Sequence, residues 1–224
     1  MMAETETILQ KFRPNEPILF EEILNMFPDH SRQWVYNPLK SLISSRRISR
    51  FATGVYYIPK YDIIFDNRIS VDKVVTKKYI RRDDDVFGYY SGMSLLYEMG
   101  IIAKKPQTIT VVSNNEKSRG RTITIHNQEI YVSKSPVHVT GTNHTVLQFL
   151  EALKITSKSE DETAFLTIYE YAREKRITIS DVSRYCVYFP DAVSKRILSG
   201  KLLKLLIIMR IKDCSFEFDM KRSL

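Results

Sequence analysis

The sequence predicts an α+β protein with two domains, residues 1–60 and 61–224. Apolar residues follow the spacing of helices in some stretches and alternate as in strands in others. Both kinds of pattern are found before residue 60 and again after it. The 224 residues, 43% of them hydrophobic, are enough for two modest packed domains or one large one.

The first domain is expected to begin with two helices. Apolar residues predict a short helix around residues 8–12, which Pro14 and Pro17 interrupt. Residues 19–27 carry apolar side chains at i, i+3, i+4 and i+7, and Pro28 ends this second helix.

A third helix is expected from Ser31, whose hydroxyl is suited to cap it. Its apolar residues between Val35 and Ile43 form one buried stripe. Because proline is tolerated best in the first turn of a helix, Asn37 is an alternative cap, with Pro38 following it. With Ser31 as the cap, the outer face carries Arg32, Gln33, Tyr36, Lys40 and Ser44.

A hairpin is expected directly after this helix. From Ile48 the apolar period changes to two, and Ala52-Thr53-Gly54 supplies the glycine that a tight turn favours. Pro59 closes the second strand. A helix followed by a two-stranded hairpin is typical of a winged helix–turn–helix.

The charge of this region favours a nucleic acid partner. The chain has a net charge of +8 and a pI of about 9.3, and no Asp or Glu occurs between Ser31 and Lys60. Such a surface suits the phosphate backbone of double-stranded DNA, because each neutralised phosphate releases counterions. A solvated basic helix face is the alternative. The residues expected to contact DNA are Arg32, Gln33, Tyr36, Lys40 and Ser44, with Arg46, Arg47, Arg50 and Thr53 on phosphates.

The second domain is expected to combine a small antiparallel sheet with a layer of helices. Residues 61–68 form a linker or an edge strand. Helices are expected over 70–79 and 91–99, from Asn143, around 165–172, over 180–185 and over 191–198. Strands are expected over 108–112, 122–125 and 129–132.

A second basic stretch lies between Ser194 and Lys212, where acids are again missing. We expect it to meet an acidic protein partner or to extend the DNA footprint. The candidate partner-binding residues are Lys195, Arg196, Lys201 and Lys204.

The sequence gives no indication of an enzyme, a metal or a cofactor. The four histidines are scattered, no phosphate-binding glycine motif occurs, and Asp83-Asp84-Asp85 lacks supporting carboxylates. Cys186 and Cys214 are expected to be buried free thiols in a reducing cytosol. Neither a signal peptide nor a membrane-spanning stretch is expected, which favours the cytoplasm.

Several strings resemble the AbiE-type antitoxin family. LKSLISSRRISRFATGVYYIPK (39–60) is similar to the family's winged helix in its leucine-containing helix, basic turn and Gly-Val-Tyr-Tyr-x-Pro string. GYYSGMSLLYEMGI (88–101) resembles its aromatic-small-Gly-x-Ser-x-Leu helix, and KPQTITVVSN and NHTVLQFLEALK follow its order of strand and helix. Arg46-Arg47 stands where the family often has a glycine.

This resemblance implies an antitoxin that represses its own operon and opposes a co-encoded nucleotidyltransferase toxin. It implies binding to the chain's own promoter, with a possible homodimer on paired half-sites. The alternative is a stand-alone regulator whose second domain senses a ligand or dimerises. An enzyme with an appended winged helix is a third possibility.

Overall fold

The computed structural model describes residues 2–60, 69–157 and 161–198. The chain divides into two compact units. The N-terminal unit comprises Met1–Lys78 with Ile125–Asn127, and the C-terminal unit comprises Tyr79–Thr124 with Gln128–Leu224. The expected linker, residues 61–68, lies outside the described residues, so the boundary at residue 60 stays a prediction.

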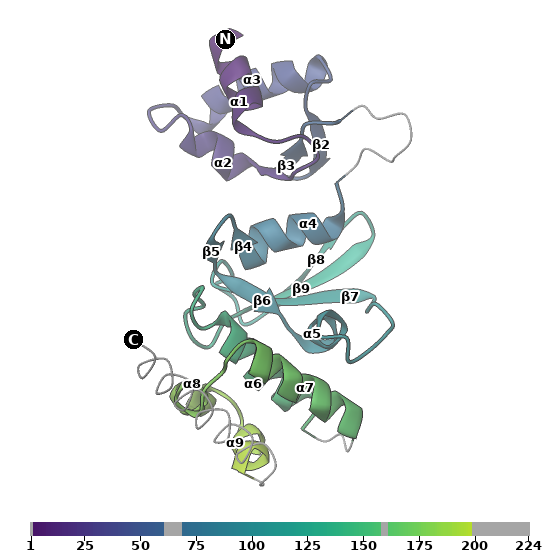
Figure 1. The fold of residues 1–224 in the computed structure, drawn as a ribbon. Coiled ribbons are helices and arrows are strands. Elements are labelled where there is room, and N and C mark those ends of the chain that lie inside the picture. Colours follow the sequence, from purple (N-terminus) through teal and green to yellow (C-terminus); the bar gives the residue numbers. More distant parts are fainter. Residues whose placement is uncertain (1, 61–68, 158–160, 199–224) are drawn as a thin grey trace, which may run out of the picture. The chain divides into compact units, whose positions relative to one another are not determined.

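The N-terminal unit contains the three expected helices and the hairpin (Figure 1). Its first three helices are α1 (Met2–Lys11), α2 (Phe20–Asn25) and α3 (Arg32–Ser44). Its strands are β1 (Ile18–Leu19), β2 (Ser49–Ala52) and β3 (Val55–Tyr57), in the order β1-β3-β2.

The strand β1 was not expected from the sequence. Ile18 and Leu19 pair antiparallel with Tyr56 and Val55 of β3. The predicted helix at Leu19 therefore begins one residue later, and the Leu19 N–H donates to the carboxylate of Glu22 at 2.8 Å. A two-residue strand is set by its partner rather than by its own pattern, so its spacing carried no signal.

One apolar core holds this unit together. It includes Ile8 of α1, Ile18 of β1, Ile23 of α2, and Leu39 and Leu42 of α3, all at most 1% exposed. Burying aliphatic side chains of this size stabilises a fold by about 1.5–3 kcal/mol each. The core therefore fixes one face of α3 toward the interior and leaves the other in solvent.

The helix α4 (Val71–Val75) continues as a π-turn over Thr76–Ile80. The Ser70 hydroxyl caps α4 by accepting the N–H of Lys73 at 3.2 Å, at the residue where the sequence predicts this helix to begin. The ammonium of Lys77 donates to the Pro17 carbonyl at 2.6 Å and pairs with Glu22 at 3.0 Å. These contacts hold the π-turn after α4 against Pro17 and α2, within the same N-terminal unit.

The sheet of the C-terminal unit is mixed, which corrects the expectation of an antiparallel sheet. In the described part, four strands lie in the order β6-β7-β9-β8, and β7 and β9 run parallel. Parallel neighbours need a long connection, which residues 114–127 provide by placing β8 on the outer edge. The four strands are β6 (Gly88–Tyr90), β7 (Thr108–Ser113), β8 (Arg121–Ile125) and β9 (Gln128–Lys134). The short strands β4 (Arg81–Arg82) and β5 (Asp85–Val86) form a separate two-stranded sheet.

Helices pack against this sheet to form the second core (Figure 1). Tyr89 and Val112 of the sheet contact a cluster from α5, α6, α7, α8 and α9. The buried carboxylate of Glu151 in α6 accepts the Ser91 hydroxyl at 2.7 Å and pairs with Lys154 at 2.7 Å. The helices are α5 (Gly92–Glu98), α6 (His144–Ile155), α7 (Glu162–Glu174), α8 (Ile179–Tyr185) and α9 (Asp191–Leu198).

A buried carboxylate organises the loop between β7 and β8. The Glu116 side chain, 6% exposed, accepts the backbone N–H groups of Lys117 and Ser118, both at 3.0 Å. It also accepts the Arg121 Nε–H at 2.7 Å. These donors, the Ser118 N–H foremost, lower the pKa of Glu116 to about 2.

The helices α3, α5 and α7 each end in the same type of turn. In each, two backbone N–H groups after the last helical turn donate back to helix carbonyls, which is the pattern of a Schellman motif. The central residue of the motif has a positive φ, which glycine adopts most easily. These residues are Arg46 (φ 59°), Gly100 (φ 73°) and Arg176 (φ 51°).

Candidate nucleic-acid interface

The helix α3 begins at Arg32, with Ser31 as its cap. The Ser31 hydroxyl accepts the Trp34 N–H at 3.2 Å, so the alternative start at Asn37 is wrong. Pro38 lies inside the helix on the buried side, beside Leu39. Because it packs inward, it leaves the opposite face unobstructed.

The exposed face of α3 is a polar stripe. Gln33, Asn37, Lys40 and Ser44 are all exposed and follow i, i+4, i+7 and i+11, so they lie on one side of the helix. Among the described residues, the side chains of Gln33, Asn37 and Lys40 have no hydrogen-bond or ion-pair partner. Ser44 donates its hydroxyl to the Lys40 carbonyl at 2.9 Å. Three side chains of the stripe are therefore available to a ligand.

Arg32 and Tyr36 lie beside this stripe and contact α2. Arg32 pairs with Glu21 at 2.9 Å, and its guanidinium lies 4.9 Å from the centre of the Phe20 ring. The ring of Tyr36, 41% exposed, stacks on Phe20 with 4.5 Å between centroids. Both side chains are thus held in place from the α2 side.

Arg46 and Arg47 follow the end of α3. Arg46 is exposed and takes the positive φ of the Schellman turn. Arg47 pairs with Glu6 of α1 at 3.2 Å, with both side chains half exposed. An exposed pair contributes about 0.2–1 kcal/mol, so a phosphate can replace the carboxylate at small cost.

The hairpin carries the last two expected DNA contacts. Arg50 is exposed on β2 opposite Tyr56 of β3, and Thr53 is exposed in the turn. The Gly54 φ of 70° closes this turn, as the sequence predicts.

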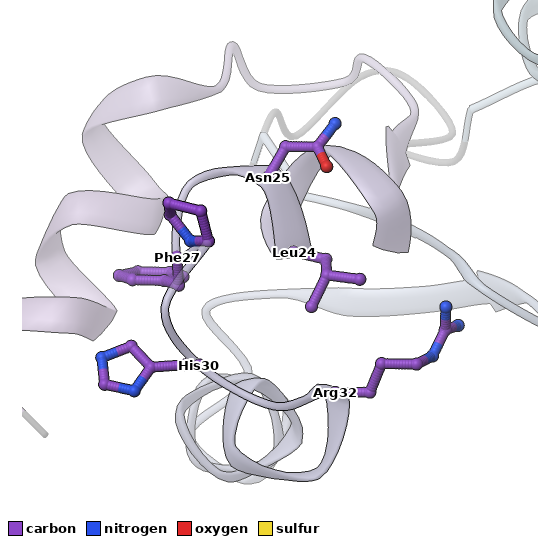
Figure 2. A pocket seen from close by; sticks show the side chains of 6 residues that line it. Leu24, Asn25, Phe27, His30 and Arg32 are labelled. Carbon is purple, nitrogen blue, oxygen red and sulfur yellow. The ribbon is translucent and has the colours of Figure 1, made fainter.

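A hollow of about 490 Å³ lies at the turn between α2 and α3. Figure 2 shows Phe27 and His30 on one side of the opening and Arg32 on the other. His30 stacks on Trp34 with 3.6 Å between ring centroids. No carboxylate occurs among the described side chains that line this hollow, but the Arg32 guanidinium that lines it is paired with Glu21.

The second basic stretch is described only as far as Leu198. Lys195 is exposed on α9. Arg196 is half-buried and donates to the carbonyl of Thr156, which caps α6, and burial lowers its pKa. Arg196 thus supports the end of α6. Lys201 and Lys204 lie outside the described residues.

Within the described ranges, the aspartates and cysteines do not form a metal site. Asp83 and Asp84 form the turn between β4 and β5, and Asp85 begins β5. Among the described residues no group of three or more potential metal ligands occurs. Cys186 is a half-buried free thiol rather than a buried one, and Cys214 lies outside the described ranges. No helix in the described part of the chain has the length and apolar character needed to cross a membrane.

Sequence reasoning missed three residues that shape this surface. Asn37 shares the stripe spacing, but the adjacent proline pointed to a helix cap instead. Glu6 and Glu21 come from other helices and bring carboxylates next to Arg47 and Arg32. The acid-free segment is therefore not an acid-free surface.

No protein-family model matches the chain, and no curated protein matches it either. The resemblance to AbiE-type antitoxins therefore rests on the quoted motifs.

Proposed function

We propose that the N-terminal unit is a winged helix–turn–helix that binds double-stranded DNA. In this proposal α3 enters the major groove and the β2–β3 hairpin contacts phosphates. The observation that carries the proposal is the α3 stripe, where Gln33, Asn37 and Lys40 are exposed and have no partner in the described part of the chain. The hairpin that follows α3, with Arg50 and Thr53 exposed, supports it further.

We further propose that the chain is a cytoplasmic antitoxin that represses its own operon and neutralises a nucleotidyltransferase-type toxin. The motif resemblance supports this role, in which the chain binds rather than catalyses. A homodimer on paired half-sites of its promoter fits such a repressor.

DNA binding is tested by gel shift of the full-length protein on its upstream promoter across a salt titration. Lys40→Gln should weaken binding, and Arg50→Gln, which removes an expected phosphate contact, should also reduce the salt slope by about 1. Lys104→Gln removes the same charge from an exposed site in the C-terminal unit and is the matched control. Binding that ignores both salt and Lys40 contradicts the proposal.

Toxin neutralisation is tested by co-expression with the neighbouring gene product, scored as rescue of growth. Lys195→Glu should weaken rescue and leave promoter binding unchanged, because Lys195 is exposed on α9. Arg196 is left intact, since it supports the end of α6. Full rescue by Lys195→Glu excludes this residue from the toxin contact.

A second candidate is a stand-alone regulator with a ligand-sensing domain. A hollow of about 510 Å³ in the C-terminal unit favours it. The hollow is lined by the β4–β5 turn, Asn114, Asn115 and residues 138–141. Growth rescue by co-expression supports the antitoxin, whereas a small molecule that alters promoter binding supports the sensor.

A further inference from the structure

The α3 stripe combines two amides and one ammonium group at positions i, i+4 and i+7 of the helix. Gln33 and Asn37 lie in the first half of α3, and Lys40 follows on the same side. Within the described structure, none of the three side chains is engaged by another protein group. Their hydrogen-bonding groups are therefore available without breaking an existing contact.

The neighbouring side chains are less available. Arg32 contacts Glu21, and Tyr36 stacks on Phe20. Ser44 donates its hydroxyl within the helix. The side chains that remain available are the amide of Gln33, the amide of Asn37 about one turn later, and Lys40 almost one turn beyond Asn37.

These side-chain types have preferred base partners. An amide can accept from N6 and donate to N7 of adenine at the same time, and lysine donates to O6 and N7 of guanine. Gln33 and Asn37 are about 6 Å apart along the helix, and Asn37 and Lys40 about 4.5 Å. Base pairs are spaced about 3.4 Å apart, so the three side chains reach bases within a few consecutive steps.

We propose that Gln33 and Asn37 contact two adenines and that Lys40 contacts a guanine in the major groove. The preferred half-site then contains a short purine-rich segment with the adenines on the Gln33 side. This inference rests on the proposed DNA-binding function and adds the base specificity of the same helix.

The test begins with selection of binding sites from a random duplex library by the full-length protein. Each adenine of the selected site is then replaced by 7-deazaadenine, which keeps N6 and lacks N7. At the adenine that Asn37 contacts, the replacement should weaken wild-type binding about 10-fold. Asn37→Ala should bind the unmodified site about 10-fold more weakly and show no further loss with 7-deazaadenine.

Gln10→Ala is the matched control, because it removes an exposed amide from α1 in the same unit. It should keep the wild-type preference and the wild-type loss with 7-deazaadenine. The thermal unfolding of Asn37→Ala should match that of the wild type, since Asn37 is exposed.

Two failures are distinguishable. If the wild-type protein selects no sequence and shows no salt-dependent DNA binding, the proposed function fails and this inference fails with it. If it selects a site but Asn37→Ala keeps the same preference and the same response to 7-deazaadenine, only the base assignment is overturned.

Discussion

Replacing Arg46 with glycine separates the stability of the N-terminal unit from its DNA binding. Arg46 has a φ of 59° at the end of α3. An L-residue in this conformation costs about 1–2 kcal/mol, and glycine recovers most of this. Glycine also adds entropy to the unfolded chain, worth about 0.5–1 kcal/mol. From the backbone alone, the expectation for Arg46→Gly is a gain of about 0.5–1 kcal/mol in the free energy of unfolding, which is set against the interaction that the Arg46 side chain makes.

The same substitution removes a cation from the expected phosphate-binding surface. DNA affinity should fall, and the slope of log K against log salt should decrease by about 1. A variant that is at least as stable as the wild type excludes unfolding as the cause of that loss. Urea denaturation measures the stability, and fluorescence anisotropy with labelled promoter DNA measures the affinity.

Arg176→Gly is the control for both effects. Arg176 has a φ of 51° in the equivalent turn after α7, in the C-terminal unit, and it is exposed. This variant should gain similar stability and lose the same net charge, but keep wild-type DNA affinity. Equal loss of affinity in the two variants refutes the placement of Arg46 on DNA. Destabilisation by Arg176→Gly refutes the argument from backbone conformation.

Three further outcomes are expected. Glu6→Gln should raise DNA affinity in a gel shift, because it releases Arg47 from its carboxylate and removes a negative charge; unchanged or lower affinity contradicts this. The pKa of Glu116 is about 2 when folded and 4.5 ordinarily, so its contribution is present above pH 4.5 and is lost as the pH falls toward 2. As the pH falls, the free energy of unfolding should decrease by at most about 3 kcal/mol through this group, and by less because its partner Arg121 is half exposed. Glu116→Gln should abolish this part of the pH dependence. Gly88→Ala should destabilise the C-terminal unit by at least about 3 kcal/mol in urea, because a Cβ there meets two backbone oxygens at 2.0 and 2.5 Å. Gly141→Ala, with no atom within 4 Å, should be nearly neutral, and equal effects would refute the steric argument.

Local signals predicted the helices well. Ser31 and Ser70 cap the starts of α3 and α4, and Gly100 follows the end of α5. Each of these residues lies within a few positions of the helix end that it stabilises, so the local sequence is sufficient to predict that end. The β2–β3 hairpin is equally local, since its turn and its alternation are adjacent in the chain.

Features set by distant residues were not predictable. The strand β1 exists because β3 lies beside it, and the parallel β7–β9 pair depends on which edge β8 occupies. In the candidate site, the exposed residues of α3 followed from its period. The carboxylates of Glu6 and Glu21 did not, because other helices bring them there.

The position of β9 has a consequence for how the C-terminal unit folds. A simple meander would place β8 directly against β7, and this arrangement is closer in sequence than the native one. In the native sheet β9 instead pairs with β7, and β8 pairs with β9 at the edge of the sheet. Closure of the β8–β9 hairpin before docking avoids the competing pairing.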